Sequence, residues 1–286
     1  MKYAFIKSHL TTWSVGRCCE VLQVSRSGYY AWRHRRPGPA LIRRRKLIEQ
    51  IRVVHEQSRR VYGSPRVHQA LEQQGQAVCR NTVARLMRQQ AIRARSKRKF
   101  VPRTTDSVHE QPIAENVLDR QFNALSPNEK WVADITYIPT GEGWLYLAAV
   151  LDLFSRRIVG WSMADHMQTQ LVDDALLMAL TGRQPPEGLL HHSDRGSQYA
   201  SDAYTHRLIE HGITLSMSGK GDCWDNAVME SFWATLKTEL VHHARFATRE
   251  QARAGIFEYI EVFYNRRRLH SSLGYQSPET FEAKHA

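Results

Sequence analysis

The sequence predicts an α/β fold built on a mixed five-stranded sheet, preceded by an all-α region. Apolar residues recur with a helical period of about 3.6 in the first third of the chain and with a strand period of 2 after residue 130. After three strand-like runs, helices and strands alternate. With 286 residues, the chain is long enough for about two domains.

The excess of positive over negative charge lies entirely in the first third of the chain. Residues 1–103 contain 24 Lys and Arg against 4 Asp and Glu, whereas residues 104–286 carry a net charge of −8 and the whole chain carries +12. Such an imbalance predicts a polyanionic partner. Anionic lipid is the alternative, but the basic residues lie among compact, capped helices and not on one long amphipathic helix. Nucleic acid is therefore favoured.

Residues 1–36 predict an N-terminal segment of helix-turn-helix type. The stretch SVGRCCEVLQVSRSGYYAWRHRR (14–36) predicts a short helix, a turn at residues 23–25 and a second helix. The sequence RPGP at 36–39 then interrupts the helical pattern.

Residues 40–95 predict a second helix-turn-helix region. A helix over 41–56 is followed by YGSPRVHQALEQQG (62–75), for which we expect Ser64 as the N-cap and Pro65 as the first helical residue. A third helix is predicted at about residues 80–90.

The third of these helices turns its apolar residues inward, and we expect it to enter the major groove of DNA. Its outward side chains are the predicted DNA contacts: Asn81, Thr82, Arg85 and Arg88. A small helical bundle without this role has a similar pattern, but the local charge favours DNA binding. Cys79 precedes the helix and is a poor cap. Beyond it, residues 96–125 lose periodicity and predict a linker, and residues 126–286 predict the α/β domain.

Three runs of period 2 predict an antiparallel meander: residues 131–140, 144–154 and 157–164. Four further elements are predicted in order: a helix at about 169–182, a strand within 188–194, a helix near 201–211 and a strand at 213–218. This is the element order of the ribonuclease-H-like fold, for which we expect the sheet order 3-2-1-4-5.

Three acids far apart in the sequence are predicted to meet at one edge of this sheet. Asp134 lies in the first strand, Asp194 follows the fourth, and Glu230 lies on the helix after the fifth, off its apolar stripe. Carboxylates this close need a cation, and oxygen-only ligands suit Mg²⁺ or Mn²⁺. Lys237 lies seven residues after Glu230 on the same face and is predicted to meet a DNA phosphate. The alternative is an ordinary solvated helix face.

Other residues of the same types have simpler explanations. Four further aspartates are candidate acids, and for two of them helix capping is sufficient explanation: Asp152, Asp165, Asp173 and Asp174. His191 and His192 are adjacent in a predicted strand and point to opposite faces, so both cannot bind one ion. The four cysteines form no CxxC pair, which predicts a reduced, cytoplasmic protein. We also expect no signal peptide and no association with a membrane, because no apolar run approaches about 18 residues.

Several motifs resemble the OrfB subunit of bacterial insertion-sequence transposases, which have a retroviral-integrase-like catalytic domain. They are W-V-A-D-I-T-Y-I (131–138), H-S-D-R-G-S-Q-Y (192–199), D-N-A-V-M-E-S-F-W (225–233) and Y-N-R-R-R-L-H-S-S-L-G-Y-Q-S-P (264–278). The chain's opening M-K-Y-A-F-I and its V-S-R-S-G-Y-Y-A-W also match OrfB N-termini. The 35 residues between Asp194 and Glu230 match the D,D(35)E spacing of this family.

The resemblance implies a transposase that cleaves DNA at element ends and transfers strands to a target through two Mg²⁺ or Mn²⁺ ions. It implies Asp134, Asp194 and Glu230 as metal ligands and Lys237 as the basic residue after the glutamate. It also implies double-stranded DNA as partner, a homo-oligomer in the synaptic complex, fusion or association with an upstream OrfA-type protein, and a place on the bacterial nucleoid.

Two rival functions remain open from the sequence alone. A ribonuclease H or simple nuclease shares the acids but needs no basic N-terminal third, whereas a DNA-binding repressor needs that third but not the acids. The arginines of Y-N-R-R-R-L-H are predicted to contact DNA or to organise the end of the catalytic domain, with a solvated turn as the alternative: Arg266, Arg267 and Arg268.

Overall fold

The computed structural model describes residues 1–95, 112–219 and 223–285. These residues form two compact units, Met1–Val53 and Val54–Ala286. The boundary between the units lies inside one helix, α4 (Pro39–Gln57). No helix in the described part of the chain is both long and apolar enough to cross a membrane.

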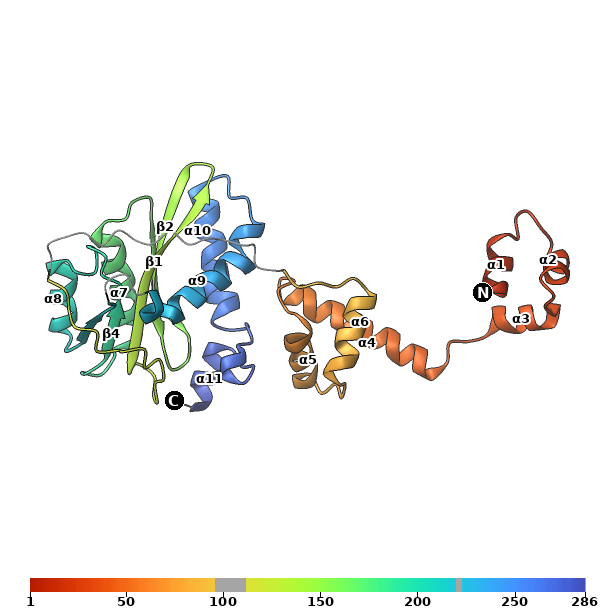
Figure 1. The fold of residues 1–286 in the computed structure, drawn as a ribbon, viewed down its shortest axis with the longest axis horizontal. Coiled ribbons are helices and arrows are strands. Elements are labelled where there is room, and N and C mark those ends of the chain that lie inside the picture. The colour runs from red at the N-terminus through yellow and green to blue at the C-terminus, as the bar shows by residue number, and fades with distance from the viewer. Residues whose placement is uncertain (96–111, 220–222, 286) are drawn as a thin grey trace. The chain divides into compact units, whose positions relative to one another are not determined.

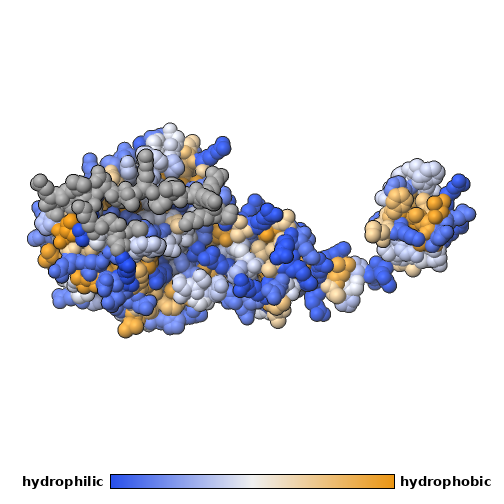
Figure 2. Space-filling view, viewed as in Figure 1, coloured by the Kyte–Doolittle hydropathy of each residue, from blue (hydrophilic) through white to orange (hydrophobic). Residues whose placement is uncertain are grey.

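The first unit contains three short helices around a small core. They are α1 (Lys2–Ser8), α2 (Val15–Val21) and α3 (Arg26–His34), with a core of Ile6, Cys18, Cys19 and Tyr29. The predicted pair of helices is confirmed, whereas α1 is additional. Ser14 and Ser25 cap α2 and α3 by accepting hydrogen bonds from backbone N–H groups. Several large apolar side chains of this unit stay exposed, and Figure 2 shows apolar residues on its surface.

The second unit begins with the end of α4, followed by α5 (Ser64–Gln73) and α6 (Arg80–Gln89). The N-cap of α5 is Gly63, so the expectation of Ser64 as the cap was wrong by one residue. Cys79 is the N-cap of α6 and makes no side-chain capping bond to the backbone. As predicted, α6 buries its apolar side, while Asn81, Arg85 and Arg88 are exposed and Thr82 is half-buried.

The rest of this unit is built on a five-stranded sheet whose order, β3-β2-β1-β4-β5, confirms the prediction. The strands are β1 (Lys130–Thr140), β2 (Gly143–Asp152), β3 (Ile158–Ala164), β4 (Leu190–Ser193) and β5 (Thr214–Met217). The first three strands form the predicted antiparallel meander, and β4 and β5 add to it in parallel. Crossover helices are required between the parallel strands.

Helices cover both faces of this sheet (Figure 1). One face carries α7 (Thr169–Arg183) and α8 (Asp202–Glu210), which pack on the main apolar core of the unit. Gly160 allows α7 to approach β3, because a Cβ there would overlap the backbone of Ala175. The other face carries α9 (Ala227–Glu239) and α10 (Arg249–Phe257).

Short elements complete the unit. They are the 3₁₀ turns η1 (Cys223–Asn226), η2 (Val241–His243) and η4 (Ser271–Leu273), the π-helical segment η3 (Glu258–Tyr264), and α11 (Pro278–His285). The π-helical segment follows α10 directly and buries Tyr259, Ile260, Phe263 and Tyr264. Its buried side chains join the C-terminal part of the chain to the face of the sheet that carries α9.

Candidate active site

Strand pairing brings the two predicted aspartates together. Val132 of β1 pairs with His192 of β4 in parallel register. Two residues further along, both segments reach an aspartate, Asp134 inside β1 and Asp194 directly after β4. Neighbouring strands lie about 4.8 Å apart. The sheet therefore supplies two adjacent carboxylates at the carboxyl end of β4.

Two donors fix the carboxylate of Asp134. The backbone N–H of Ile135 donates to Oδ1 at 2.8 Å, and the indole N–H of Trp233 on α9 donates to Oδ2 at 2.9 Å. Burial is the main reason why the pKa of Asp134 rises to about 7, and the negative charges of Asp194 and Glu230 add to it. The two hydrogen bonds act in the opposite direction. All three acids thus share one electrostatic environment.

Asp194 is held by the turn that follows it. The backbone N–H of Gly196 donates to its Oδ1 at 2.8 Å. A Cβ at residue 196 would lie 2.9 Å from this same oxygen, so glycine lets the turn close on the carboxylate. The aspartate side chain is half-buried, which leaves part of it open to a ligand.

Helix α9 contributes the third acid and the base. Asn226, at its N-cap, donates from Nδ2 to the carbonyl oxygen of Ala133 at 3.0 Å and so joins the start of the helix to β1. Glu230 is exposed, and partial desolvation raises its pKa. Lys237 lies with Nζ 5.0 Å from the centre of the Tyr137 ring, and Asp134 is close enough to oppose the lowering of the lysine pKa by burial.

Three of the four competing aspartates have structural partners, and the fourth, Asp165, is exposed. Asp152 is buried and accepts hydrogen bonds from the backbone N–H groups of Asn128 and Phe154, both at 2.8 Å. Asp173 pairs with Arg207 through both carboxylate oxygens, and Asp174 accepts a bond from Gln170. Neither begins α7, whose N-cap is Gln168, so capping was the wrong explanation for these two.

The two histidines are structural. They point to opposite faces, as predicted: His191 contacts the hydroxyl of Tyr204 at 3.0 Å, and His192 lies between the hydroxyls of Ser216 and Ser218. Burial lowers their pKa values to about 3 and about 4, so both rings are neutral near pH 7.

The three consecutive arginines do not share one environment. Arg266 and Arg267 are exposed, whereas Arg268 is 4% exposed and forms two hydrogen bonds with Glu239, at 2.9 and 2.8 Å. The predicted DNA contact does not fit Arg268, because the guanidinium is buried against a carboxylate. Its position agrees with the other expectation, an organising role at the end of the catalytic domain.

Sequence reasoning missed two residues of the site. By periodicity Trp233 belongs to the apolar stripe of α9, and no sequence pattern gives Asn226 a role. Both hydrogen bonds depend on how closely α9 approaches β1, which no local pattern reveals.

The donor set of the site fits a hard divalent cation. In the described ranges, no three His, Cys, Asp or Glu side chains already form a closed metal site. The acids nevertheless supply only carboxylate oxygens. Burial and then the charges of Asp194 and Glu230 raise the pKa of Asp134, and a bound cation would favour the ionised carboxylate.

Known proteins share both parts of the chain. Residues 43–100 match the family of HTH-like domains, and residues 124–223 and 211–278 match integrase core domains. The chain is 47% identical over 269 residues to the 31 kDa protein of insertion element IS600 from Shigella sonnei, covering 93% of this chain and 98% of that protein. It is 45% identical over 289 residues to the transposase InsF for insertion sequence IS3A from Escherichia coli (strain K12), covering 99% of each.

Solved structures with related architecture include retroviral integrases. The catalytic core domain of HTLV-2 integrase in complex with magnesium has a TM-score of 0.44 at 15% identity, covering 56% of this chain and 99% of that chain. The simian T-cell lymphotropic virus intasome in complex with PP2A regulatory subunit B56 gamma has a TM-score of 0.47 at 14% identity, covering 80% and 73%. The identity to the IS3A transposase over nearly the full length of both proteins is decisive: the chain belongs to the insertion-sequence transposases of OrfB type, which catalyse DNA cleavage and strand transfer.

Proposed function

We propose that Asp134, Asp194 and Glu230 are the acids with which this transposase cleaves element ends and joins them to target DNA. The parallel register that sets Asp194 beside Asp134 is the observation that carries the proposal. The effect of Glu230 on the Asp134 carboxyl connects the third acid to the pair.

The three carboxylates would hold Mg²⁺ or Mn²⁺, and two such ions supply activation of the attacking oxygen and stabilisation of the leaving oxygen in phosphodiester chemistry. The protein's own part is positioning. Trp233 and the N–H of Ile135 keep the Asp134 carboxylate in one orientation, and the N–H of Gly196 does the same for Asp194. Lys237 extends from the Glu230 face of α9, where we assign it to a phosphate of the bound strand.

DNA contacts outside the acids are assigned to two exposed basic surfaces. On α6, they are Asn81, Thr82, Arg85 and Arg88, which would read the major groove. In the C-terminal segment, they are Arg266 and Arg267, whose side chains are exposed. The division into segments 1–36, 40–95, 96–125 and 126–286 remains a prediction, in part because residues 96–111 lie outside the described ranges.

The assembly is also part of the proposal. Transposition joins two DNA ends to one target, so a homo-oligomer in the synaptic complex follows from the reaction. An upstream OrfA-type protein, fused or associated, would add to end recognition. The protein would act in the cytoplasm, on the nucleoid.

The test uses the full chain with Asp134→Asn, Asp194→Asn and Glu230→Gln. Each substitution is nearly isosteric and removes a repulsive charge, so we expect the fold and the DNA gel shift to persist while Mg²⁺-dependent nicking and joining are lost. Asp165→Asn is the control, since this aspartate is exposed directly after β3 and we assign it no metal. EDTA should abolish the wild-type activity, and a strand-transfer product separates a transposase from a nuclease.

Either of two results would remove the assignment. The acids would be wrongly chosen if any of the three variants kept near-normal joining, or if Asp165→Asn lost joining while remaining folded. Loss should be equally deep for all three, because residues that act as one unit are not additive.

A further inference from the structure

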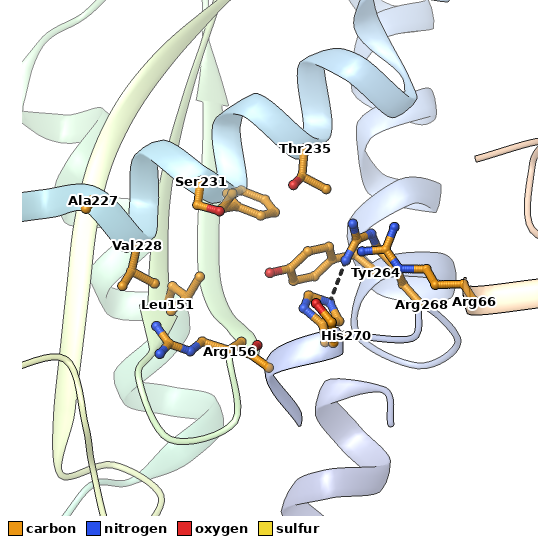
Figure 3. A pocket seen from close by; sticks show the side chains of 13 residues that line it. Arg66, Leu151, Arg156, Ala227, Val228, Ser231, Thr235, Tyr264, Arg268 and His270 are labelled. Carbon is orange, nitrogen blue, oxygen red and sulfur yellow. Dashed lines mark hydrogen bonds between the residues drawn. The ribbon is translucent and has the colours of Figure 1, made fainter. Parts of the chain in front are cut away.

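A second polar site lies on a different side of α9 from Glu230 and Lys237. It is a cavity of about 380 Å³ bounded by α9, the β2–β3 turn, the C-terminal segment and α5 (Figure 3). On α9, Ser231 and Thr235 line it, one turn apart. The cavity is within the range of volumes typical of ligand sites.

Three arginines from separate segments line this cavity, and among the residues that the structure describes no acidic side chain does. They are Arg66 of α5, Arg156 of the β2–β3 turn and Arg268 of the C-terminal segment. Glu239 does not line the cavity, but it accepts two hydrogen bonds from Arg268 and lies 3.9 Å from Arg66. This carboxylate offsets one of the three positive charges, so two remain uncompensated.

Arg156 is the arginine whose hydrogen-bond donors are available to a ligand. Its half-buried guanidinium has no hydrogen-bond or ion-pair partner among the described residues. Burial lowers its pKa, and the nearby charge of Asp152 only partly opposes this. Asp152 is itself engaged by two backbone N–H groups and lies 3.8 Å from Arg183. A half-buried cation in this position is stabilised by an oxyanion, whose oxygen atoms accept its hydrogen bonds.

Hydroxyl donors surround the arginines. In the described structure, the side chains of Ser231, Thr235, Ser271 and Ser272 have no hydrogen-bond partner within the protein. Burial raises the pKa of Tyr264, so its phenol is a neutral donor. His270 accepts from Arg268 at 3.2 Å through Nε2, and burial together with the cationic neighbours keeps its pKa well below the usual value. The lining therefore offers many donors and few acceptors.

We propose that this cavity binds one phosphate group of the DNA backbone. Arginine forks and hydroxyl groups are the side chains that proteins use for phosphate oxygens. Arg156 and the hydroxyl groups would contact the phosphate, whereas Arg268, which is held by Glu239, would contribute positive charge without direct contact. The inference rests on the proposed function in one respect, that DNA is the partner. It assigns DNA contact to Arg156 and to the second side of α9, so one helix would meet DNA on two sides.

The first measurement uses inorganic phosphate as the probe. Phosphate should raise the melting temperature of the full chain above that in chloride of equal ionic strength. Arg156→Gln and Ser272→Glu should abolish this increase, whereas Ser272→Ala and Arg245→Gln should retain it. Ser272 is exposed, so its variants test the site even if Arg156→Gln fails to fold, and Arg245 is an exposed arginine outside the cavity.

The second measurement identifies the source of the phosphate. Affinity for a fluorescent duplex carrying one element end is measured in EDTA between 50 and 200 mM NaCl. Losing one phosphate contact should lower the slope of log affinity against log salt by about 0.9, which is roughly a 3-fold smaller loss over this range. Arg156→Gln and Ser272→Glu should show this change, and Ser272→Ala should not.

Two possible outcomes would each overturn one part of the proposal. A lost phosphate response with an unchanged DNA slope would overturn the DNA assignment in favour of a free phosphate. An equal phosphate response in wild type and Ser272→Glu would overturn the site itself. No chemistry takes place in EDTA, so these results stand apart from failure of the catalytic assignment.

Discussion

We expect the substitution Arg268→Met to lower the stability of the fold. Its direct effect on DNA affinity should be smaller than this loss of stability. The guanidinium is 4% exposed and forms two hydrogen bonds with Glu239, which is itself only 6% exposed. Methionine fills similar space but leaves the glutamate with the Tyr259 hydroxyl at 2.8 Å and with Arg66 at 3.9 Å. Breaking a buried pair on one side costs about 3–5 kcal/mol, because a charge stays buried without its partner.

This free energy predicts a measurable shift. For a unit of this size, 1 kcal/mol corresponds to about 2–4 °C, so we expect the melting temperature to fall by about 10 °C. Urea unfolding of the full chain should give the same loss. Arg266→Met is the matched control, because that side chain is exposed and lies 3.7 Å from the half-buried Glu279, a solvent-accessible pair that contributes less than about 1 kcal/mol.

A second substitution separates the buried charge from lost packing. Adding Glu239→Gln to Arg268→Met removes the stranded charge, so the double variant should recover part of the lost stability, about 1–3 kcal/mol. If Arg268→Met melted like wild type and instead weakened DNA binding as much as Arg267→Met, the buried pair would be the wrong explanation for this residue.

Three further outcomes are expected. Trp233→Phe removes one of the two donors to Asp134 and should lower the joining rate about 10-fold or more with little change in DNA affinity, and an unchanged rate in single-turnover assays would contradict this. The raised pKa of Asp134 means that the folded metal-free protein holds a proton up to about pH 7 that the unfolded chain releases near pH 4. In EDTA, the stability of wild type relative to Asp134→Asn should therefore rise as the pH falls from 8 to 5, by up to about 3 kcal/mol in urea unfolding. The buried neutral histidines destabilise both proteins below about pH 6.5, and their effect cancels in this comparison. Arg85→Ala should weaken duplex binding and lower its salt slope by about 0.9, and an unchanged slope in gel-shift titrations would exclude Arg85 as a phosphate contact.

The sheet was predictable because its signals are local. The strand-like runs at 131–140 and 144–154 and the turn between them at 141–143 predict a hairpin, and helices must separate the parallel strands that follow. The short helix α1 was missed because seven residues carry little periodic signal. The start of α5 was misplaced by one residue because both Gly63 and Ser64 are acceptable N-caps.

The acids of the site were predictable from strand order and helix phase, but their surroundings were not. Trp233 belongs to the apolar side of α9 by periodicity, and only the packing of α9 on β1 brings its N–H to Asp134. The sequence left the choice between DNA contact and an organising role open for Arg268, because its partner, Glu239, is 29 residues earlier in the sequence and on another element. An arginine within a run of arginines is expected to be exposed, because charged side chains are seldom buried without a partner.

Helix α9 has consequences for how this transposase can evolve. Its sides contact the apolar core, the acids and the cationic cavity. The core side has Met229, Phe232 and Leu236, the acid side has Glu230, Trp233 and Lys237, and the cavity side has Ser231 and Thr235. Few positions of the helix are therefore free to vary. Adaptation to a new DNA end would then arise mostly on α6 or in surface loops. In a library of random single substitutions selected for transposition, α9 should be among the least tolerant helices, and changed specificity should map elsewhere.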